Sequence, residues 1–179
     1  MTISETDIRN SRILVVDDQP VNVELLEQML KHEGYTRVTS TTNPCEVCAL
    51  YGENHYDLIL LDLKMPGMDG FEVMQALKVR YPQDYLPILV ITAEPGHKLH
   101  ALQAGARDFV SKPFDMLETK TRIRNMLEVR LLYQALEKSN QVLEQTVQER
   151  TAELRESEAR YRSLTELASD WYWEQDEAG

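Results

Sequence analysis

The first 125 residues alternate short apolar runs with amphipathic stretches, and this alternation restricts the chain to very few folds. Five apolar runs occur, at Ile13–Val16, Val38–Thr41, Leu58–Leu61, Ile88–Ile91 and Asp108–Val110. The first, third and fourth consist almost entirely of β-branched residues and leucine, which is typical of strands buried on both faces of a parallel sheet. The other two runs are less apolar, so we expect them nearer the edges of the sheet.

The segments between these runs have the apolar spacing of helices. The predicted helices span Val21–His32, Pro44–Glu53, Phe71–Arg80 and Gly96–Ala104. Pro20 and Pro44 suit the first turn of a helix, and Gly34 and Gly105 suit helix ends. Strands that alternate with helices predict a doubly wound α/β domain with right-handed crossovers.

The chain changes character near Met126. All seven prolines and six of the seven glycines precede this residue, and Gly179 is the last residue. Residues 126–179 contain six basic and twelve acidic side chains. A charged segment without helix breakers predicts one long, exposed helix.

Composition excludes several classes of function. The formal net charge is −11, which argues against a nucleic-acid-binding surface because phosphates are neutralised by clustered lysine and arginine. No apolar run is long enough to span a membrane, and the polar residues 1–12 do not resemble a secretion signal. Two cysteines cannot build a disulfide framework. We therefore expect a cytoplasmic protein.

Polar side chains stand where the predicted strands end. Asp17 and Asp18 follow the first strand, Asp62 the third and Thr92 the fourth, while Lys112 follows the fifth. Ligand sites of open α/β sheets lie outside the carboxyl ends of the strands, so we expect these five side chains to converge.

Three carboxylates at one edge repel each other unless a cation compensates them. Hard oxygen ligands with room for water suit Mg²⁺ better than Zn²⁺. A carboxylate beside Mg²⁺ and Lys112 could accept a phosphoryl group, with Thr92 donating a hydrogen bond to one of its oxygens. The alternative is that each acid merely caps the helix that follows it.

These residues carry a resemblance to a known family. The segments Leu14–Asp18, Leu61–Gly67, Thr92-Ala93 and Lys112-Pro113 resemble the receiver domain of two-component response regulators, over roughly Arg12 to Leu127. The resemblance implies a flavodoxin-like fold, with a five-stranded parallel sheet in the spatial order 2-1-3-4-5.

The resemblance also implies a chemistry for the site. Asp62 would be phosphorylated by a histidine kinase or a phosphotransfer protein. Asp18, Asp62 and the backbone carbonyl of Lys64 would bind Mg²⁺, with Asp17 assisting, and Lys112 would contact the phosphoryl group.

Two positions match the family's switch pair. The hydroxyl of Thr92 would move toward the phosphoryl group while the ring of Phe109 swings inward. Tyrosine is common at the second position, and Phe109 lacks the phenol that could contact an output domain. The resemblance further implies a cis peptide bond between Lys112 and Pro113.

Lys64 and Glu94 occupy positions at which the family tunes the lifetime of the phosphoryl group. We hypothesise that the two side chains pair across the mouth of the site and hinder the attacking water. The alternative is two solvated charges without coupling, since exposed ion pairs are usually weak.

A seven-residue repeat can be placed on the predicted long helix. Its a positions are Met126, Tyr133, Asn140, Val147, Leu154, Tyr161 and Ala168, and its d positions are Val129, Leu136, Leu143, Arg150, Ser157 and Leu164. Ten of these thirteen residues are apolar or aromatic, which favours a coiled coil. Asn140 at an a position favours a parallel homodimer in fixed register. The alternative is a monomeric helix folded back on the first domain.

The end of the chain resembles parts of larger signalling proteins. Val147–Leu154 resembles signalling helices with a Glu-Arg-Thr signature, and Tyr161–Asp176 resembles the beginning of a PAS sensor domain. We expect an N-terminal tail at residues 1–11, a receiver at 12–127, a helical linker at 128–160 and the start of a PAS-like domain at 161–179. The sequence would then be a piece of a longer protein, whose output domain, stimulus and cognate kinase it does not identify.

Two other functions remain open. An aspartyl-nucleophile phosphatase of the haloacid dehalogenase type would need a second acid two residues after Asp62, where this chain has Lys64. A receiver that is never phosphorylated could serve only as a dimerisation scaffold. The Cys45–Cys48 spacing matches redox or metal pairs, but the pair stands alone, and we interpret both residues as small buried hydrophobes.

Overall fold

A computed structural model of the chain describes the backbone of residues 3–93 and 98–176, and the side chains of residues 3–93 and 99–166. The elements are α1 (Glu5–Arg9), β1 (Arg12–Val16), α2 (Pro20–His32), β2 (Arg37–Thr41), the 3₁₀ helix η1 (Pro44–Glu46), α3 (Val47–Asn54), β3 (Leu58–Asp62), α4 (Gly70–Arg80), β4 (Ile88–Thr92), α5 (Lys98–Ala104), β5 (Asp108–Ser111) and α6 (Met116–Asp176). The chain divides into two units, Met1–Gln134 and Ala135–Gly179.

The first unit contains one parallel sheet with the strand order β2-β1-β3-β4-β5. This is the predicted order, and the two less apolar strands lie at its edges as expected. Each observed strand extends its predicted run by one residue at one end, with β2 gaining Arg37 and β5 gaining Ser111.

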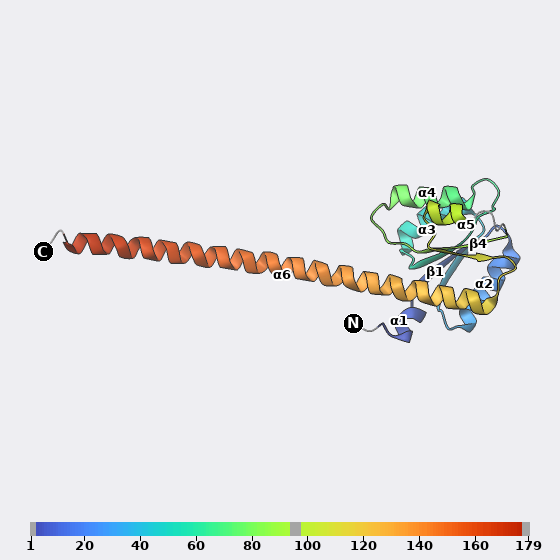
Figure 1. Ribbon diagram of the computed structural model, residues 1–179, viewed down its shortest axis with the longest axis horizontal. Helices are drawn as coiled ribbons and strands as arrows, with labels where there is room; N and C mark the ends of the chain where they lie inside the picture. The colour runs from blue at the N-terminus through green and yellow to red at the C-terminus, as the bar shows by residue number, and fades with distance from the viewer. Residues whose placement is uncertain (1–2, 94–97, 177–179) are drawn as a thin grey trace. The chain divides into compact units, whose positions relative to one another are not determined.

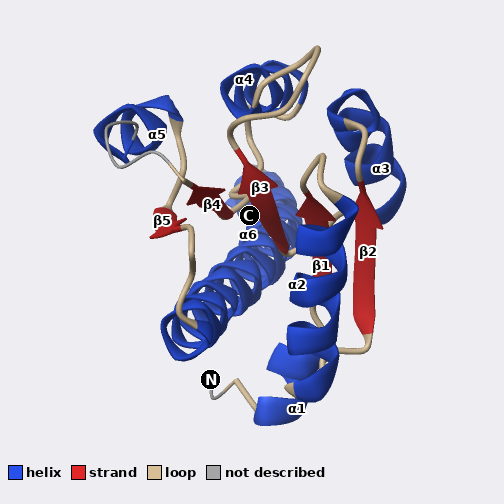
Figure 2. Ribbon diagram, turned by 90° about the vertical axis from the view of Figure 1, so that its right-hand side faces the viewer, coloured by secondary structure: helices blue, strands red, loops and turns tan. Residues whose placement is uncertain are grey.

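Helices cover both faces of this sheet (Figures 1 and 2). Leu14, Val16 and Leu61 face one core, which is closed by α3, α4 and α5. Ile13 and Leu60 face the other core, which is closed by α1, α2 and the first turns of α6. Neighbouring residues of a strand point to opposite faces, so a continuous apolar run supplies both cores.

Three local features differ from the sequence-based expectation. Residues 1–11 are not all irregular, because α1 begins with a capping box between Ser4 and Asp7 and buries Ile8. The helix predicted from Pro44 is divided into η1 and α3. The long helix begins at Met116, ten residues before the predicted start, where the Asp115 side chain accepts a hydrogen bond from the Glu118 amide at 2.9 Å.

The amino-terminal edge of the sheet holds α6 through a polar network. Asp57 precedes β3, and its carboxylate accepts hydrogen bonds from the Arg12 amide and from Gln134 Nε2, both at 2.9 Å. Arg130 donates to the carbonyl of Tyr85 and lies 3.9 Å from Asp57 Oδ1, with about a tenth of its side chain exposed. The ring of Tyr85 also stacks on that of Tyr133 at 4.7 Å. These contacts fix α6 to the sheet up to the end of the first unit.

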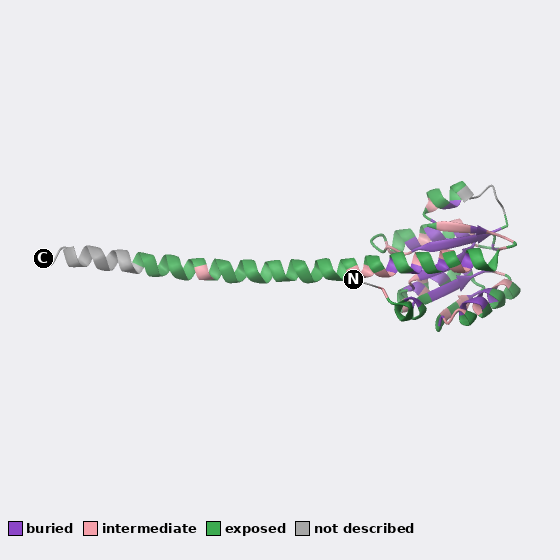
Figure 3. Cartoon of the chain, turned by 60° about the horizontal axis from the view of Figure 1, so that its bottom comes forward, coloured by how far each residue is buried: buried purple, intermediate pink, exposed green. Residues whose placement is uncertain are grey.

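The second unit is helical over all of its described residues, Ala135 to Asp176. Every residue from 136 to 156 is exposed, as are residues 158–166 (Figure 3). Large apolar side chains are among them, including Leu136, Leu143 and Leu154, each 58–61% exposed. An exposed row of apolar side chains at this spacing is unusual for a helix that acts alone.

Candidate functional site

Three carboxylates meet at the carboxyl ends of the strands. Asp17 follows β1, Asp18 is the next residue, and Asp62 ends the neighbouring strand β3. One oxygen from each of the three lies within 4.8 Å of the others. Asp17 and Asp62 are buried, with 1% and 5% of their surface exposed. The structure therefore brings together acids that are 44 residues apart in the sequence.

Lys112 completes the cluster from the other side. Its Nζ lies 2.8 Å from Asp17 Oδ2 and 3.1 Å from Asp62 Oδ1. The backbone amide of Lys112 donates to the Thr92 carbonyl at 2.7 Å, which joins this residue to the end of β4. The peptide bond between Lys112 and Pro113 is cis, as the resemblance implied.

Asn22 belongs to the site, although the sequence analysis did not identify it. Its Nδ2 lies 3.0 and 3.1 Å from the two carboxylate oxygens of Asp17. The Gln19 amide also donates to Asp17 Oδ1 at 3.0 Å. The available signal was an amide side chain in the first turn of the helix that follows an acid pair. Asn22 and Lys112 together occupy both oxygens of Asp17 and orient this carboxylate.

Burial and charge oppose each other at Asp62. Burial raises the pKa of Asp62, and the nearby Asp17 and Asp18 raise it further, which outweighs the lowering effect of Lys112. Burial by itself would lower the pKa of Lys112, but its hydrogen bonds to Asp17 and Asp62 raise it overall. The cluster thus contains three carboxyl groups and the one ammonium group of Lys112, and the ionised form of Asp62 is disfavoured.

One oxygen of the cluster lacks any compensation. Asp18 Oδ1 is buried and has no hydrogen-bond partner among the described residues. A buried carboxylate oxygen without a donor is costly, and a hard divalent cation is the kind of group that would satisfy it. The donor set is made of carboxylate oxygens, and it fits Mg²⁺.

The loop after Asp62 packs closely against the site because of a glycine. A Cβ on Gly70 would lie 2.5 Å from the carbonyl oxygen of Asp62 and 2.9 Å from the Cα of Leu63. The Gly70 amide instead donates to the Leu63 carbonyl at 3.0 Å. Asp69 then caps α4, since its side chain accepts from the Glu72 amide. A side chain at position 70 would push this loop away from Asp62.

Thr92 and Phe109 lie on neighbouring strands. Thr92 ends β4, is 2% exposed, and follows the residue that pairs with Asp62 in the sheet register. Phe109 on β5 is half-buried against the α3–α5 core, and the guanidinium carbon of Arg122 lies 5.9 Å from its ring centre. Lys64 is exposed in the loop after β3, whereas Glu94 lies outside the described residues.

The two cysteines differ from the interpretation as buried hydrophobes. Cys45 is exposed at the start of η1, and Cys48 is half-buried. Cys45 lies in η1, and its amide donates a hydrogen bond to the side chain of the capping residue Asn43. The exposed position of Cys45 therefore follows from the geometry of this capped turn. Burial raises the pKa of the Cys48 thiol, which makes it a poor nucleophile.

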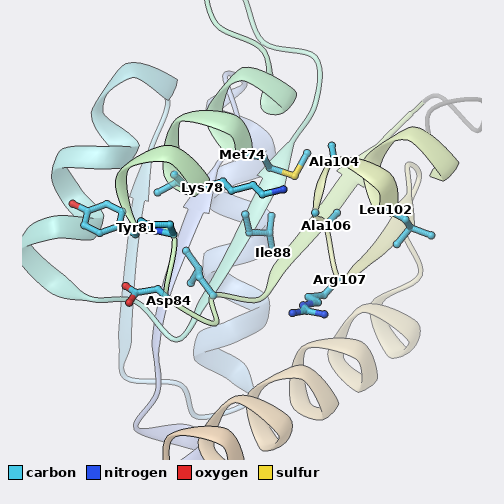
Figure 4. A pocket seen from close by; sticks show the side chains of 13 residues that line it. Met74, Lys78, Tyr81, Asp84, Ile88, Leu102, Ala104, Ala106 and Arg107 are labelled. Carbon is cyan, nitrogen blue, oxygen red and sulfur yellow. The ribbon is translucent and has the colours of Figure 1, made fainter. Parts of the chain in front are cut away.

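A separate cavity of about 350 Å³ lies between α4 and α5 (Figure 4). Its lining includes Ile88 at the start of β4, together with Lys78 and Arg107, whose side chains Figure 4 shows at its border. None of its lining residues belongs to the carboxylate cluster. The cavity lies near the amino-terminal ends of β4 and β5, whereas the carboxylates lie at the carboxyl ends of β1 and β3.

The described helices include no candidate for a membrane span. None of them combines the length and the apolar character needed to cross a bilayer.

Comparison with known proteins identifies the family. The family model described as the response regulator receiver domain matches residues 13–124, which is more than half of the chain. Response regulator PleD of Caulobacter vibrioides is 39% identical over 129 residues, which cover 71% of this chain and 28% of PleD. Transcriptional regulatory protein YvrH of Bacillus subtilis is 33% identical over 133 residues, covering 74% of this chain and 55% of YvrH.

Solved structures agree with this assignment. The receiver domain of the sensor histidine kinase PA1611 from Pseudomonas aeruginosa, which has a magnesium ion in its active site cleft, is 31% identical with a TM-score of 0.60. The match covers 66% of this chain and 98% of that domain. Chemotaxis protein CheY4 of Vibrio cholerae is 29% identical with a TM-score of 0.58, covering 64% of this chain and 98% of CheY4.

The chain belongs to the response regulator receiver domain family of two-component signalling. It spans about a quarter of PleD and about half of YvrH. A receiver domain implies a histidine kinase or a phosphotransfer protein as its partner.

Proposed function

We propose that Asp62 is the phosphoacceptor of this receiver. One observation carries the proposal, namely the close meeting of Asp17, Asp18 and Asp62 with Lys112 at the carboxyl edge of the sheet. Among the three acids, Asp62 is the one that ends a strand. It contacts Lys112, and the hydrogen bonds of Asn22 go to Asp17 instead. Its carboxylate oxygen would attack phosphorus while the bond from phosphorus to the donor breaks.

Mg²⁺ would be held by Asp18, Asp62 and the backbone carbonyl of Lys64, with Asp17 close by. When bound, this ion would neutralise charge on the transferring oxygens. The uncompensated Asp18 Oδ1 supports this assignment, and so does the magnesium ion in the related PA1611 receiver. Lys112 holds its ammonium group where a phosphoryl group on Asp62 would need a cation.

Thr92 and Phe109 would respond to the new phosphoryl group. Thr92 stands at the end of the strand next to Asp62, so its hydroxyl can donate to a phosphoryl oxygen. The space that this hydroxyl leaves would admit the ring of Phe109, which is half-buried on the neighbouring strand. Lys64 and Glu94 would tune the lifetime of the phosphoryl group, and an unchanged rate of dephosphorylation in Lys64→Ala would contradict this role.

The long helix would pair with a second copy to form a parallel coiled coil. Ile123 and Leu127 of α6 are fully buried, whereas Val129 is 51% exposed. Two residues correspond to about 200° around a helix, so Val129 faces away from the sheet. Leu136 and Leu143 continue the row of exposed apolar residues, and Asn140 would fix the register of the pair. A seam interrupted by Asn140 and Arg150 would allow two packings of similar energy, as a signal transmitter needs.

The signal would pass from this helix to an output domain. The resemblance of Tyr161–Asp176 to the start of a PAS domain supports such a continuation, and we place the protein in the cytoplasm. The alternatives are a scaffold that is never phosphorylated and a small-molecule phosphatase. A scaffold would not need the pairing of Lys112 with two carboxylates, and the phosphatase would need an acid at the position of Lys64.

The experiment is phosphorylation by acetyl phosphate, followed by intact mass spectrometry. We expect the wild type to gain one phosphoryl group when Mg²⁺ is present and none after chelation, and Asp62→Asn to gain none under either condition. Asp69→Asn is the matched control, because asparagine also caps a helix and the charge change is the same. A label that persists in Asp62→Asn would contradict the assignment, and no label on any variant would favour the scaffold.

A further inference from the structure

A second candidate site lies at the amino-terminal edge of the sheet, opposite the carboxylates. A cavity of about 480 Å³ opens there beside the starts of β1 and β2 and the end of α3. Figure 2 shows β1 and β2 side by side near α3. Its lining residues are Arg12, Arg37, Val38, Thr39, Glu53, Asn54 and Tyr56.

The sheet register places two arginines next to each other in this cavity. Arg12 of β1 and Arg37 of β2 are direct partners in the parallel pairing. Side chains of directly paired residues point to the same face, and neighbouring strands are about 5 Å apart. The two positive charges therefore start from adjacent positions and repel each other unless an anion lies between them.

The protein compensates these charges only in part. Arg12 Nη1 donates to the carbonyl of Asn54, which is a neutral acceptor. Arg37 has neither a hydrogen bond nor an ion pair with any side chain that the structure describes. Glu53 lines the same cavity, yet it forms no ion pair with either arginine within the described part of the chain. An arginine pair without a carboxylate partner is a common way to bind an oxyanion.

A tyrosine is also among the residues that line this cavity. Tyr56 is 1% exposed, and its Oη has no hydrogen-bond partner among the described residues. Buried tyrosine hydroxyls usually find a partner, because leaving one unsatisfied is costly. The Tyr56 hydroxyl has almost no accessible surface, so a ligand in this cavity would contact the two guanidinium groups and not this hydroxyl.

We propose that this cavity binds the phosphate group of a small molecule. Arg12 and Arg37 supply the charge and the planar pairs of N–H donors that match phosphate oxygens. The volume exceeds that of phosphate alone and falls in the range of small-molecule sites, so the remainder of the ligand would occupy the space beside Thr39 and Glu53. This site is independent of the phosphorylation of Asp62.

The test is a titration of the full chain with inorganic phosphate, in EDTA and at constant ionic strength set with sodium chloride. Without Mg²⁺ the three carboxylates repel phosphate from the other edge of the sheet. We expect a saturable rise in melting temperature, and amide NMR shifts in Arg12, Arg37, Thr39 and Tyr56. Arg37→Gln should weaken the apparent affinity at least about fivefold, a change that matches removal of one charge-assisted contact.

Two further variants keep this test specific. Arg80→Gln removes the same charge from an exposed position at the end of α4 and should retain full affinity. Tyr56→Phe removes an enclosed hydroxyl, so it should leave the affinity for phosphate unchanged. A response that does not saturate, an unchanged affinity in Arg37→Gln, or an equal loss in Arg80→Gln or Tyr56→Phe would overturn the proposal.

Discussion

Residues up to Gln134 bury most of their leucines and valines between a sheet and two layers of helices, whereas the leucines and valines from 136 to 166 are exposed to water. Leu89 on β4 is completely buried, and Leu154 on α6 is 61% exposed. Charged residues differ in the same way. Lys112 holds two buried carboxylates, while the pair of Arg150 and Glu153 lies on the surface. The first unit therefore has a packed core of its own, whereas the leucines of the second unit between residues 136 and 166 lie in no core.

The largest expected effect is a difference in stability between variants of a buried and an exposed leucine. Leu89→Ala should lower the free energy of unfolding by about 2–5 kcal/mol, because it leaves a cavity in a packed core. Leu154→Ala should change it by less than about 0.5 kcal/mol in dilute protein, since it empties no core. Urea denaturation followed by circular dichroism measures both. Equal losses in the two variants would contradict the division into a packed unit and an unpartnered helix.

Two ion pairs give the next comparison. Asp57→Ala removes the acceptor of Gln134 and the counter-charge of nearly buried Arg130, so we expect a loss of about 2 kcal/mol in the free energy of unfolding. Glu153→Ala should cost at most about 0.5 kcal/mol, because both partners of its ion pair are exposed. Chemical denaturation of both variants measures the two losses in the free energy of unfolding. A loss in Asp57→Ala as small as that in Glu153→Ala would show that the network at the amino-terminal edge does not hold α6.

The dimer proposal predicts a gain of affinity. Asn140→Ile replaces a polar a residue with an apolar one and should tighten self-association about tenfold, which equals about 1.4 kcal/mol. Sedimentation equilibrium over a range of concentrations measures this change. Lys138→Gln, an exposed change on the side of the helix away from the seam, serves as the control. An unchanged dissociation constant in Asn140→Ile would place Asn140 outside any seam.

The smallest effect concerns a tyrosine and its dependence on pH. Burial raises the pKa of Tyr51, and its hydrogen bond to Asp84 raises it further. The unfolded chain ionises this group above about pH 10 while the folded protein keeps it protonated, so its contribution to stability should be lost as the pH rises beyond that value.

Tyr51→Phe tests this expectation. The variant should be about 1 kcal/mol less stable than the wild type at pH 7, because the hydrogen bond to Asp84 is lost. The difference should shrink at pH 11, as the wild type alone is then penalised. Tyr161→Phe, in the exposed second unit, is the control and should change the free energy of unfolding at pH 7 by less than about 0.5 kcal/mol. A constant difference between pH 7 and pH 11 for Tyr51→Phe would contradict the assignment.

The sequence predicted the features that depend on local pattern and on fold topology. Apolar runs located all five strands, and their position in the sheet placed Asp17, Asp18 and Asp62 at one edge. The contacts that a pattern cannot supply were missed. Asn22 could be linked to Asp17 only once the direction of α2 was known, and Asp57 joins Arg12, Arg130 and Gln134 across more than 40 residues in each case.

Helix limits show a second reason for the differences. The long helix begins at Met116 because Asp115 caps it, yet the change in composition that signals a helix comes ten residues later. In the segment between, alternating exposed and buried residues obscure the pattern, since one face packs on the sheet. Cap chemistry at Ser4 and Asp7 likewise produced α1 in a segment whose composition favoured no element.

The position of the acquired phosphoryl group tests the role of Asp62 as the phosphoacceptor most directly. Acyl phosphates on aspartate can be reduced by borohydride to homoserine, and peptide mass spectrometry then locates the modified residue. After treatment with acetyl phosphate and Mg²⁺, we predict homoserine at position 62 and at none of Asp17, Asp18 or Asp69. Homoserine at another aspartate, or none in a protein that carries the label, would contradict the central claim.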